Sequence, residues 1–462
     1  MKTPDTLRSR LRAAFAALAL VAVCLAGCTD TPDAPAGQGR IRAVHAIPEF
    51  GTVAFLIEAV TLSQLTYQET GAFEQFDSLN YDFNFDTVDG VTVQTLRLAS
   101  QTLTLAPDTD YTFFLTGTPD APVVTLATLP ELVEDDSATT VELWFSNLSR
   151  VADEVDLYLG EADFDPASTT PLLTVANNTF SELVTIDAGS LQLVATRAGD
   201  PADILIRTEL VTLTGGDRAL LNLFDSQNLD TGEFTMSIST SAATSVALVD
   251  VAAPSQVQLV HASASAGSID LLVDASTTPA IAALSFGQTT VPTTIEEAGA
   301  EALTLFVTPA GDPGVQLVEQ EVVLIDAGVN FIVLFGDQAD ETLALARTEV
   351  VRQPVFDAAR LGIFNTVLDV DRIEFYLLRE DDVLEETNPI LISPAFDGSR
   401  VLTSTVISAD NYRIVVTNNA DDSILAGPID LPLQAGDIRQ VVLADTLDPN
   451  VVEVLVIDPL NP

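Results

Sequence analysis

Histidine and cysteine, the side chains that most often serve as general bases, nucleophiles and transition-metal ligands, are scarce: the 462 residues include two of each. His45 and His261 each end a short apolar run, and Asn147 and Asn365 stand at the matching place in two similar runs. An amide can replace an imidazole as a hydrogen-bonding partner of a turn, but it cannot act as a general base near neutral pH. We therefore predict that these four residues cap turns, and we expect no catalytic residue, metal site or cofactor.

Both cysteines lie near the start of the chain. Lys2 and three arginines precede an apolar run at 13–26, which is too short for a comfortable membrane span and is typical of an export signal. The run ends in L-A-G-C at 25–28, which resembles a bacterial lipobox. The resemblance implies cleavage before Cys28, a thioether-linked diacylglycerol on its sulfur and acylation of its new amino group. The alternative is an ordinary secretory signal that is cut elsewhere.

Residues 1–27 are accordingly expected to be a lipoprotein signal peptide, and 28–39 a lipidated flexible tether rich in Pro, Gly and Asp. Thr29 follows the lipid site, so the aspartate that retains lipoproteins in the inner membrane is not at that position. We expect an outer membrane lipoprotein that faces the periplasm or the cell surface. Because Cys24 lies inside the signal, the exported part has no disulfide available.

Acidic residues outnumber basic ones by 67 to 19, which gives a formal net charge of -48. A field of that sign repels nucleic acid and anionic headgroups, so the membrane is an expected partner only through the lipid anchor. Asp82, Asp86 and Asp89 faintly resemble a calcium loop, and acidic pairs stand at 135–136 and 421–422. Their spacing departs from the EF-hand pattern of ligands at alternate positions, which favours solvated surface charge over a metal site.

One pattern of strand, turn and strand recurs four times along the chain. In its clearest copy, 257–274, alternating apolar residues lead to His261, and a second alternating run begins eight residues later at Ile269. The His or Asn positions are 102, 114 and 104 residues apart, and a second landmark recurs at intervals of 108, 112 and 108 residues. The second landmark is a turn residue three positions before a late strand: Asp108, Gly216, Gly328 and Gly436. Two landmarks with nearly the same period predict a fourfold repeat.

Short β-branched segments separated by Gly, Asp and Pro turns, with no sustained helical period after residue 40, indicate an all-β protein. We predict four tandem antiparallel β-sandwich domains, immunoglobulin-like, of about seven strands each. The predicted domains cover residues 40–131, 139–251, 255–351 and 358–459. Four such domains in a row would form a stalk-like rod of roughly 130 Å.

Most aromatic residues in the predicted strands are expected to lie in the cores of these domains. Trp144 is different, because it has the opposite parity to Leu143 and Phe145. We expect Trp144 to face outward or toward a neighbouring domain.

Several of the motifs resemble a known family. The stretches V-H-A-S (260–263) and I-D-L-L-V-D (269–274), the V-H-A-I-P at 44–48, the turn P-A-G-D-P (309–313) and the segment 326–336 are similar to the bacterial domain of unknown function 4397. The likeness is good in the first and third copies and weaker in the second and fourth, which lack the histidine. It covers about residues 40–458. The resemblance implies an extracytoplasmic all-β module found in tandem in exported, often lipid-anchored proteins, and it implies no reaction.

The sequence thus predicts a lipid-anchored cell-envelope protein that acts as a structural or interaction (display) protein and is not an enzyme. Its partner would be a protein or a glycan, and acidic faces or free sheet edges would contact it. The alternative is a calcium-dependent adhesion protein or a carbohydrate- or ligand-binding surface protein that uses clefts between domains. A hydrolase is the least favoured function, since the sequence contains no G-x-S-x-G motif.

Overall fold

The computed structural model describes residues 37–88, 95–133, 135, 137–226, 234–241, 245–274, 276–295, 302–325, 328–394 and 404–460. Over these residues the chain is all-β, with 34 strands in eight sheets and two 3-10 helices of three residues each. The predicted fold class is therefore confirmed at this level. No helix in the described ranges is long and apolar enough to cross a membrane.

The first segment, residues 38–130, holds two four-stranded sheets that share one hydrophobic core. Its strands are β1 (Gln38–His45), β2 (Val53–Ile57), β3 (Val60–Leu65), β4 (Glu74–Asp77), β5 (Asn80–Thr87), β6 (Arg97–Thr104), β7 (Thr109–Thr118) and β8 (Ala121–Pro130). The strand orders are β4-β1-β7-β8 and β3-β2-β5-β6. Four phenylalanine rings, those of Phe55, Phe83, Phe85 and Phe113, pack between the two sheets at centroid distances of 4.7 to 6.0 Å.

The second segment, residues 140–248, has the same arrangement with extra edge strands. Its elements are β9 (Thr140–Asn147), β10 (Glu154–Gly160), η1 (Pro166–Ser168), β11 (Leu173–Ala176), β12 (Thr179–Phe180), β13 (Val184–Asp187), β14 (Gly189–Arg197), β15 (Ile204–Leu213), β16 (Arg218–Asp225), β17 (Phe234–Ser239) and β18 (Val246–Leu248). The strand orders are β12-β9-β16-β17-β18, with β13 also paired to β9, and β11-β10-β14-β15. Residues from both sheets form a single core cluster.

The third segment, residues 255–349, has the orders β22-β19-β25-β26 and β21-β20-β23-β24. Its strands are β19 (Ser255–His261), β20 (Ile269–Val273), β21 (Ile281–Leu284), β22 (Thr293–Ile295), β23 (Leu303–Pro309), β24 (Val318–Val322), β25 (Val329–Phe335) and β26 (Ala344–Glu349). Its core again draws on both sheets.

The fourth segment, residues 358–457, has the orders β30-β27-β33-β34 and β29-β28-β31-β32 around its own core. Its elements are β27 (Ala358–Asn365), β28 (Arg372–Leu378), η2 (Leu384–Glu386), β29 (Leu391–Pro394), β30 (Thr405–Ser408), β31 (Asp410–Asn418), β32 (Ile424–Leu433), β33 (Ile438–Asp445) and β34 (Val452–Ile457).

Two local predictions can be compared with these strands. The second strand of each segment begins within one residue of its predicted start, at Val53, Glu154, Ile269 and Arg372, so that prediction is confirmed. At the late turn, Asp108, Gly216 and Gly436 have φ of 52, 87 and 84°, the left-handed region that favours glycine and tolerates aspartate. Gly328 does not lie in that region, so a left-handed conformation does not explain the glycine at this turn.

The sheets are not purely antiparallel, and this corrects the sequence prediction. In every segment the first strand pairs in parallel with a late strand: β1 with β7, β9 with β16, β19 with β25 and β27 with β33. A parallel pair needs a long crossover between its strands, and the whole second sheet of the segment supplies it. The alternation of apolar residues along a strand does not reveal the direction of its partner, which is why the sequence did not show this pairing.

The central strands of the sheets that contain the parallel pairs are buried on both faces. Every residue of β19, β25 and β27 is buried, as expected for strands covered on two sides. One face of each such sheet packs on the core of its own segment, and the other packs on the corresponding sheet of a neighbouring segment. Edge strands of the second sheets are more open: β6 has only half-buried and exposed positions, whereas the central strand β20 of a second sheet is fully buried.

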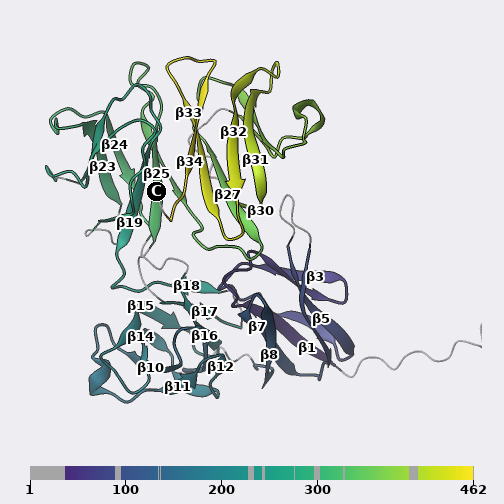
Figure 1. The fold of residues 1–462 in the computed structure, drawn as a ribbon. Helices are drawn as coiled ribbons and strands as arrows, with labels where there is room; N and C mark the ends of the chain where they lie inside the picture. Colours follow the sequence, from purple (N-terminus) through teal and green to yellow (C-terminus); the bar gives the residue numbers. More distant parts are fainter. Residues whose placement is uncertain are drawn as a thin grey trace, which may run out of the picture.

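The segments therefore associate in two pairs and not as a rod. Val44, Phe114, Trp144, Leu220 and Phe224 belong to one cluster that joins the first segment to the second. A second cluster joins the third segment to the fourth; it includes Val260, Phe331, Val333, Phe364, Val442 and Ile457. We call these the first pair and the second pair. Figure 1 shows the second pair, in green to yellow, above the first pair, in purple to teal, so the extended rod expected from the sequence is wrong.

Each pair joins two different kinds of segment. The first and third segments end their first strand in histidine, whereas the second and fourth end it in asparagine. Only the second and fourth contain a described 3-10 helix after their second strand, η1 and η2. The late strand of the parallel pair ends in Asp225 or Asp445 in these two segments. Glycine stands at the equivalent position of the other two segments. The chain thus alternates between two segment types, and the alternation matches the pairing.

Candidate functional site

The four predicted turn-capping residues lie at equivalent places, and all four are buried. In each, the Nδ1 of the histidine or the Oδ1 of the asparagine accepts a hydrogen bond from the backbone amide two residues later, at 3.1 to 3.4 Å. The donors are the amides of Ile47, Ser149, Ser263 and Val367. The same cap is therefore made by two different side chains.

The second nitrogen of each histidine reaches across the turn. His45 Nε2 lies 3.1 Å from the carbonyl oxygen of Phe50 and 3.2 Å from that of Gly51, and His261 Nε2 lies 2.6 Å from the carbonyl oxygen of Gly267. Because carbonyls only accept and Nδ1 already accepts, the proton is on Nε2 and the ring is neutral. Burial lowers the pKa of His45 to about 4, against the opposing effect of the two carbonyls. Burial also lowers the pKa of His261.

The acidic candidates are separated or lie outside the described residues. Asp89 and Asp136 are outside them, as is Cys28 with the rest of residues 1–36. Asp86 forms an ion pair with Arg97, and Asp82 accepts a hydrogen bond from a threonine on β6. Over the described ranges, no group of three or more His, Cys, Asp or Glu residues is arranged to hold a metal ion.

The acidic pairs at 135–136 and 421–422 include turn caps. Asp135 and Asp421 each accept hydrogen bonds from the backbone and the hydroxyl of the serine two residues later. These bonds lower the pKa of both carboxyl groups. Asp422 has a φ of 57°, so this turn uses the tolerance of aspartate for the left-handed region.

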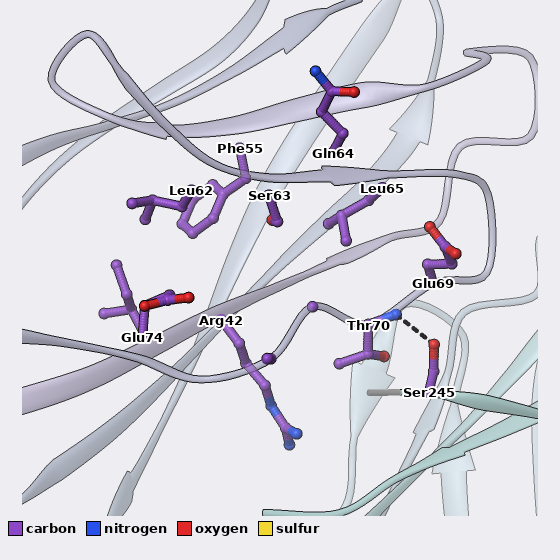
Figure 2. A pocket seen from close by; sticks show the side chains of 13 residues that line it. Arg42, Phe55, Leu62, Ser63, Gln64, Leu65, Glu69, Thr70, Glu74 and Ser245 are labelled. Atoms are coloured by element: carbon purple, nitrogen blue, oxygen red, sulfur yellow. Dashed lines mark hydrogen bonds between the residues drawn. The ribbon is translucent and has the colours of Figure 1, made fainter. Parts of the chain in front are cut away.

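A cavity of about 320 Å³ opens into the first segment between β3 and the chain at 69–74. Its floor is apolar and consists of core residues, among them Ile41, Phe55 and Leu65. Polar groups surround its mouth; Figure 2 shows Ser63, Gln64, Glu69, Thr70, Glu74 and Ser245. Ser245 comes from the second segment, and its Oγ accepts a hydrogen bond of 2.9 Å from the Thr70 amide. The cavity is thus a gap between two sheet edges above the core.

Arg42 borders this cavity, but its guanidinium makes its hydrogen bonds elsewhere. Figure 2 shows its guanidinium pointing away from Phe55 and Leu62. The group is 2% exposed and donates to the hydroxyls of Thr112 and Ser239, the latter across the boundary with the second segment. Burial lowers the pKa of Arg42 to about 9, which the charge of a nearby aspartate partly offsets. Its role is to hold two segments together.

That aspartate, Asp110, is the centre of a buried ion network between the first and second segments. It is 3% exposed and accepts from Arg40 at 2.7 and 2.9 Å and from Arg218 at 3.1 Å. Arg218 also pairs with Glu142 of its own segment, at 2.6 Å. A buried carboxylate with two cationic partners is well compensated, so this network fixes how the two segments face each other.

A second cavity, of about 290 Å³, lies between the first and fourth segments, where the two pairs meet. We call it the cleft. The first segment contributes residues 50–52, 87–88 and 95–96, and the other side consists of Val406 of the fourth segment and the chain at 355–358, which leads into that segment. Phe50 and Phe356 meet there edge to face, with ring centroids 6.2 Å apart and an interplanar angle of 85°. Phe356 is 41% exposed, whereas Phe50 is 3% exposed.

The cleft is anchored by specific contacts on one side. The Phe356 amide donates to the Glu49 carbonyl at 2.7 Å. The Glu49 carboxylate forms an ion pair of 2.7 Å with Arg150 of the second segment. The turn that carries Phe50 is the one capped by His45. Three segments and a buried histidine thus fix the position of this wall.

Comparison with known proteins gives one family match. The model of the family described as "Domain of unknown function (DUF4397)" matches residues 39–158. The matched stretch runs from β1 through the first segment and into β10. No curated protein matches the chain.

Among solved structures, the chain is similar to "CBMbc (family CBM26) from Eubacterium rectale Amy13K in Complex with Maltoheptaose". The identity is 12%, and the alignment covers 44% of this chain and 96% of that one, with a TM-score of 0.17. A similarity at that TM-score assigns neither a fold nor a ligand.

The sequence did not reveal the cleft or the ion network. The cleft joins residues about 300 positions apart, and no local pattern reports such a contact. The ion network left a visible signal: R-I-R at 40–42 is a local excess of positive charge in a chain with 19 basic residues. The faces between segments also left a signal, since the run F-I-V-L-F at 331–335 is apolar at both parities.

Proposed function

We propose that the chain is a lipid-anchored cell-envelope protein whose four segments are tandem immunoglobulin-like β-sandwich domains of one family, acting as a structural or interaction protein without catalysis. One observation carries this proposal. Both histidines are fully buried, neutral and hydrogen-bonded to the turns that they cap, so they support the fold. The common strand order of the four segments supports their treatment as one kind of domain.

The lipid anchor at Cys28 is supported by the motif L-A-G-C at 25–28. Acyl chains on Cys28 would hold the protein in the outer membrane, and residues 28–39 would space the first domain from the bilayer. Metabolic labelling with a palmitate analogue tests this. The parent protein is expected to take up label and to partition into detergent, and Cys28→Ser is expected to do neither. Equal labelling of both proteins would contradict the anchor.

Two experiments test whether the protein displays its acidic surface to a partner: one determines where the protein is located, and the other determines whether it turns over any substrate. Protease treatment of intact cells, compared with lysed cells, distinguishes a cell-surface location from a periplasmic one. Purified protein is expected to leave ester, peptide and glycoside substrates unchanged. Turnover that is lost in His261→Asn would show that the protein is an enzyme and would contradict the proposal.

A second candidate function is ligand binding or calcium-dependent adhesion, and the cleft between the two pairs favours its ligand-binding form. Thermal unfolding with millimolar Ca²⁺, with Mg²⁺ and NaCl as controls, tests the calcium form. We expect equal rises in Tm for salts of matched ionic strength, because screening relieves the repulsion of a net charge of -48. A rise specific to Ca²⁺ would favour the adhesion protein instead.

A further inference from the structure

The cleft differs from the other cavity in how its walls are made. The gap above the core of the first segment has a floor of core side chains, whereas the cleft is bounded by two pairs of segments that are each held together by their own apolar cluster. Small-molecule sites occur preferentially at interfaces of this kind. Its volume of about 290 Å³ is at the low end of ligand pockets, which corresponds to one or two sugar rings.

One wall of the cleft is held in place before any ligand arrives. His45 Nε2 holds the carbonyls of Phe50 and Gly51, and a Cβ placed on Gly51 would lie 3.4 Å from Val406 Cγ2, so the two walls approach to van der Waals contact here. The Phe356 amide is bound to the Glu49 carbonyl. A site built from restrained groups loses little entropy when it binds.

The chemistry of the wall suits a ring with one apolar face and a polar edge. Phe356 presents an aromatic surface that its edge-to-face contact with Phe50 leaves 41% exposed. Asp357 follows it with a φ of 55°, a backbone conformation that few residue types adopt. The hydroxyl-bearing residues Thr52 and Thr95 line the opposite wall. An aromatic face beside hydroxyl and carboxylate groups is the combination that recognises a sugar.

The charge of the protein determines which sugars can enter. The chain carries a formal net charge of -48, and among the described residues that line the cleft the charged one is Asp357. An acidic sugar would be repelled by both. We propose that the cleft binds a neutral saccharide, with Phe356 as the stacking surface and Asp357, Thr52 and Thr95 as hydrogen-bonding partners of its hydroxyls. This inference rests on the proposed binding role and names a ligand class for it.

Calorimetric titration of the full-length protein in detergent tests the proposal. The probes are maltose, cellobiose, lactose, xylobiose and diacetylchitobiose, with glucuronic acid as the anionic comparison. At least one neutral disaccharide is expected to bind saturably, and glucuronic acid is expected not to bind. Binding by none of the five, or tighter binding of glucuronic acid, would overturn the proposal.

Variants then locate the site. Phe356→Leu keeps an apolar contact with Phe50 but removes the aromatic face, so affinity is expected to fall at least tenfold, while Phe356→Trp is expected to retain it. Val123→Ala, which alters a residue that is 51% exposed on β8, is the matched control and is expected to change nothing. An affinity unchanged in Phe356→Leu would show that the sugar binds elsewhere. Labelling at Cys28 does not depend on this outcome, so failure here is distinguishable from failure of the proposed envelope role.

Discussion

The ring of Phe114 on β7 meets the indole of Trp144 on β9 edge to face across the boundary between the first and second segments, with centroids 5.9 Å apart at 81°. Both side chains are almost fully buried, and Phe180 packs against both of them. The sequence predicts that Trp144 faces either outward or toward a neighbouring domain. The second alternative is confirmed. Each segment of the first pair thus buries part of its surface only because the other is present.

Replacing Trp144 by Ala is expected to lower the free energy of unfolding by about 3–5 kcal/mol, the usual cost of removing a large buried aromatic side chain. Trp144→Phe is the control: it keeps an aromatic ring and removes a buried indole N–H that has no hydrogen-bond partner among the described residues, so its cost is expected to be smaller. Urea unfolding monitored by circular dichroism measures both. Equal losses for the two variants would contradict this account.

Asp110 provides a test of the ion network. Asp110→Asn removes the charge that compensates Arg40 and Arg218, so the free energy of unfolding is expected to fall by about 3–5 kcal/mol. Asp203→Asn breaks the exposed Arg197–Asp203 pair and is expected to cost about 0–1 kcal/mol. The same urea experiment compares them. A similar small loss for both variants would show that the buried network contributes little.

His45 makes stability depend on pH in a direction that can be derived. Its folded-state pKa of about 4 is below the ordinary value of 6.5, so the unfolded chain binds the proton more readily. The contribution of neutral His45 to the free energy of unfolding is fully present above pH 6.5. About 3 kcal/mol of this free energy is lost as the pH falls from 6.5 toward 4.

His45→Asn, which copies the cap of the second and fourth segments, lacks this titration. Its unfolding free energy is expected to fall less than that of the parent between pH 7.5 and pH 4.5, as measured by urea unfolding at each pH. Parallel pH profiles for the two proteins would show that the imidazole does not become protonated on unfolding in this range.

The pairing of segments predicts which fragments fold. Residues 37–251 and 252–460, produced separately, each retain one apolar cluster between segments and are expected to unfold cooperatively. Residues 37–133 alone would expose Val44 and Phe114 and are expected to bind a hydrophobic dye and to aggregate. Circular dichroism and dye fluorescence check these outcomes. A soluble, cooperative 37–133 fragment would show that single segments are the independent units.

Much of the strand arrangement could be read from the sequence because it depends on local patterns. The start of each second strand and the left-handed turn at Asp108 follow from alternation and turn chemistry. The parallel pairing of β1 with β7 could not be read, since 63 residues separate the two strands and alternation carries no direction. The side-by-side association of segments could not be read for a related reason: an apolar face that packs on a neighbouring segment has the same sequence pattern as one that packs on its own core.

The candidate site likewise has one part that could be predicted from the sequence and one part that could not. The equivalence of His45 with Asn147 is visible in the sequence, and the structure gives both the same bond to the amide two residues later. The contact between Phe50 and Phe356 depends on how the two pairs of segments dock, and nothing near either residue encodes that docking.

The parallel pairing has a consequence for how the first segment responds to a force applied at its N-terminal end. β1 is the first described strand of the chain, and six consecutive residue pairs join it to β7 in parallel. Tension applied through the N-terminus pulls along β1, so it loads these hydrogen bonds in shear, all at once, and does not open them one after another as it would in a hairpin pulled from its ends. The first strand of the first segment is therefore arranged as a mechanical clamp that resists extraction from its sheet.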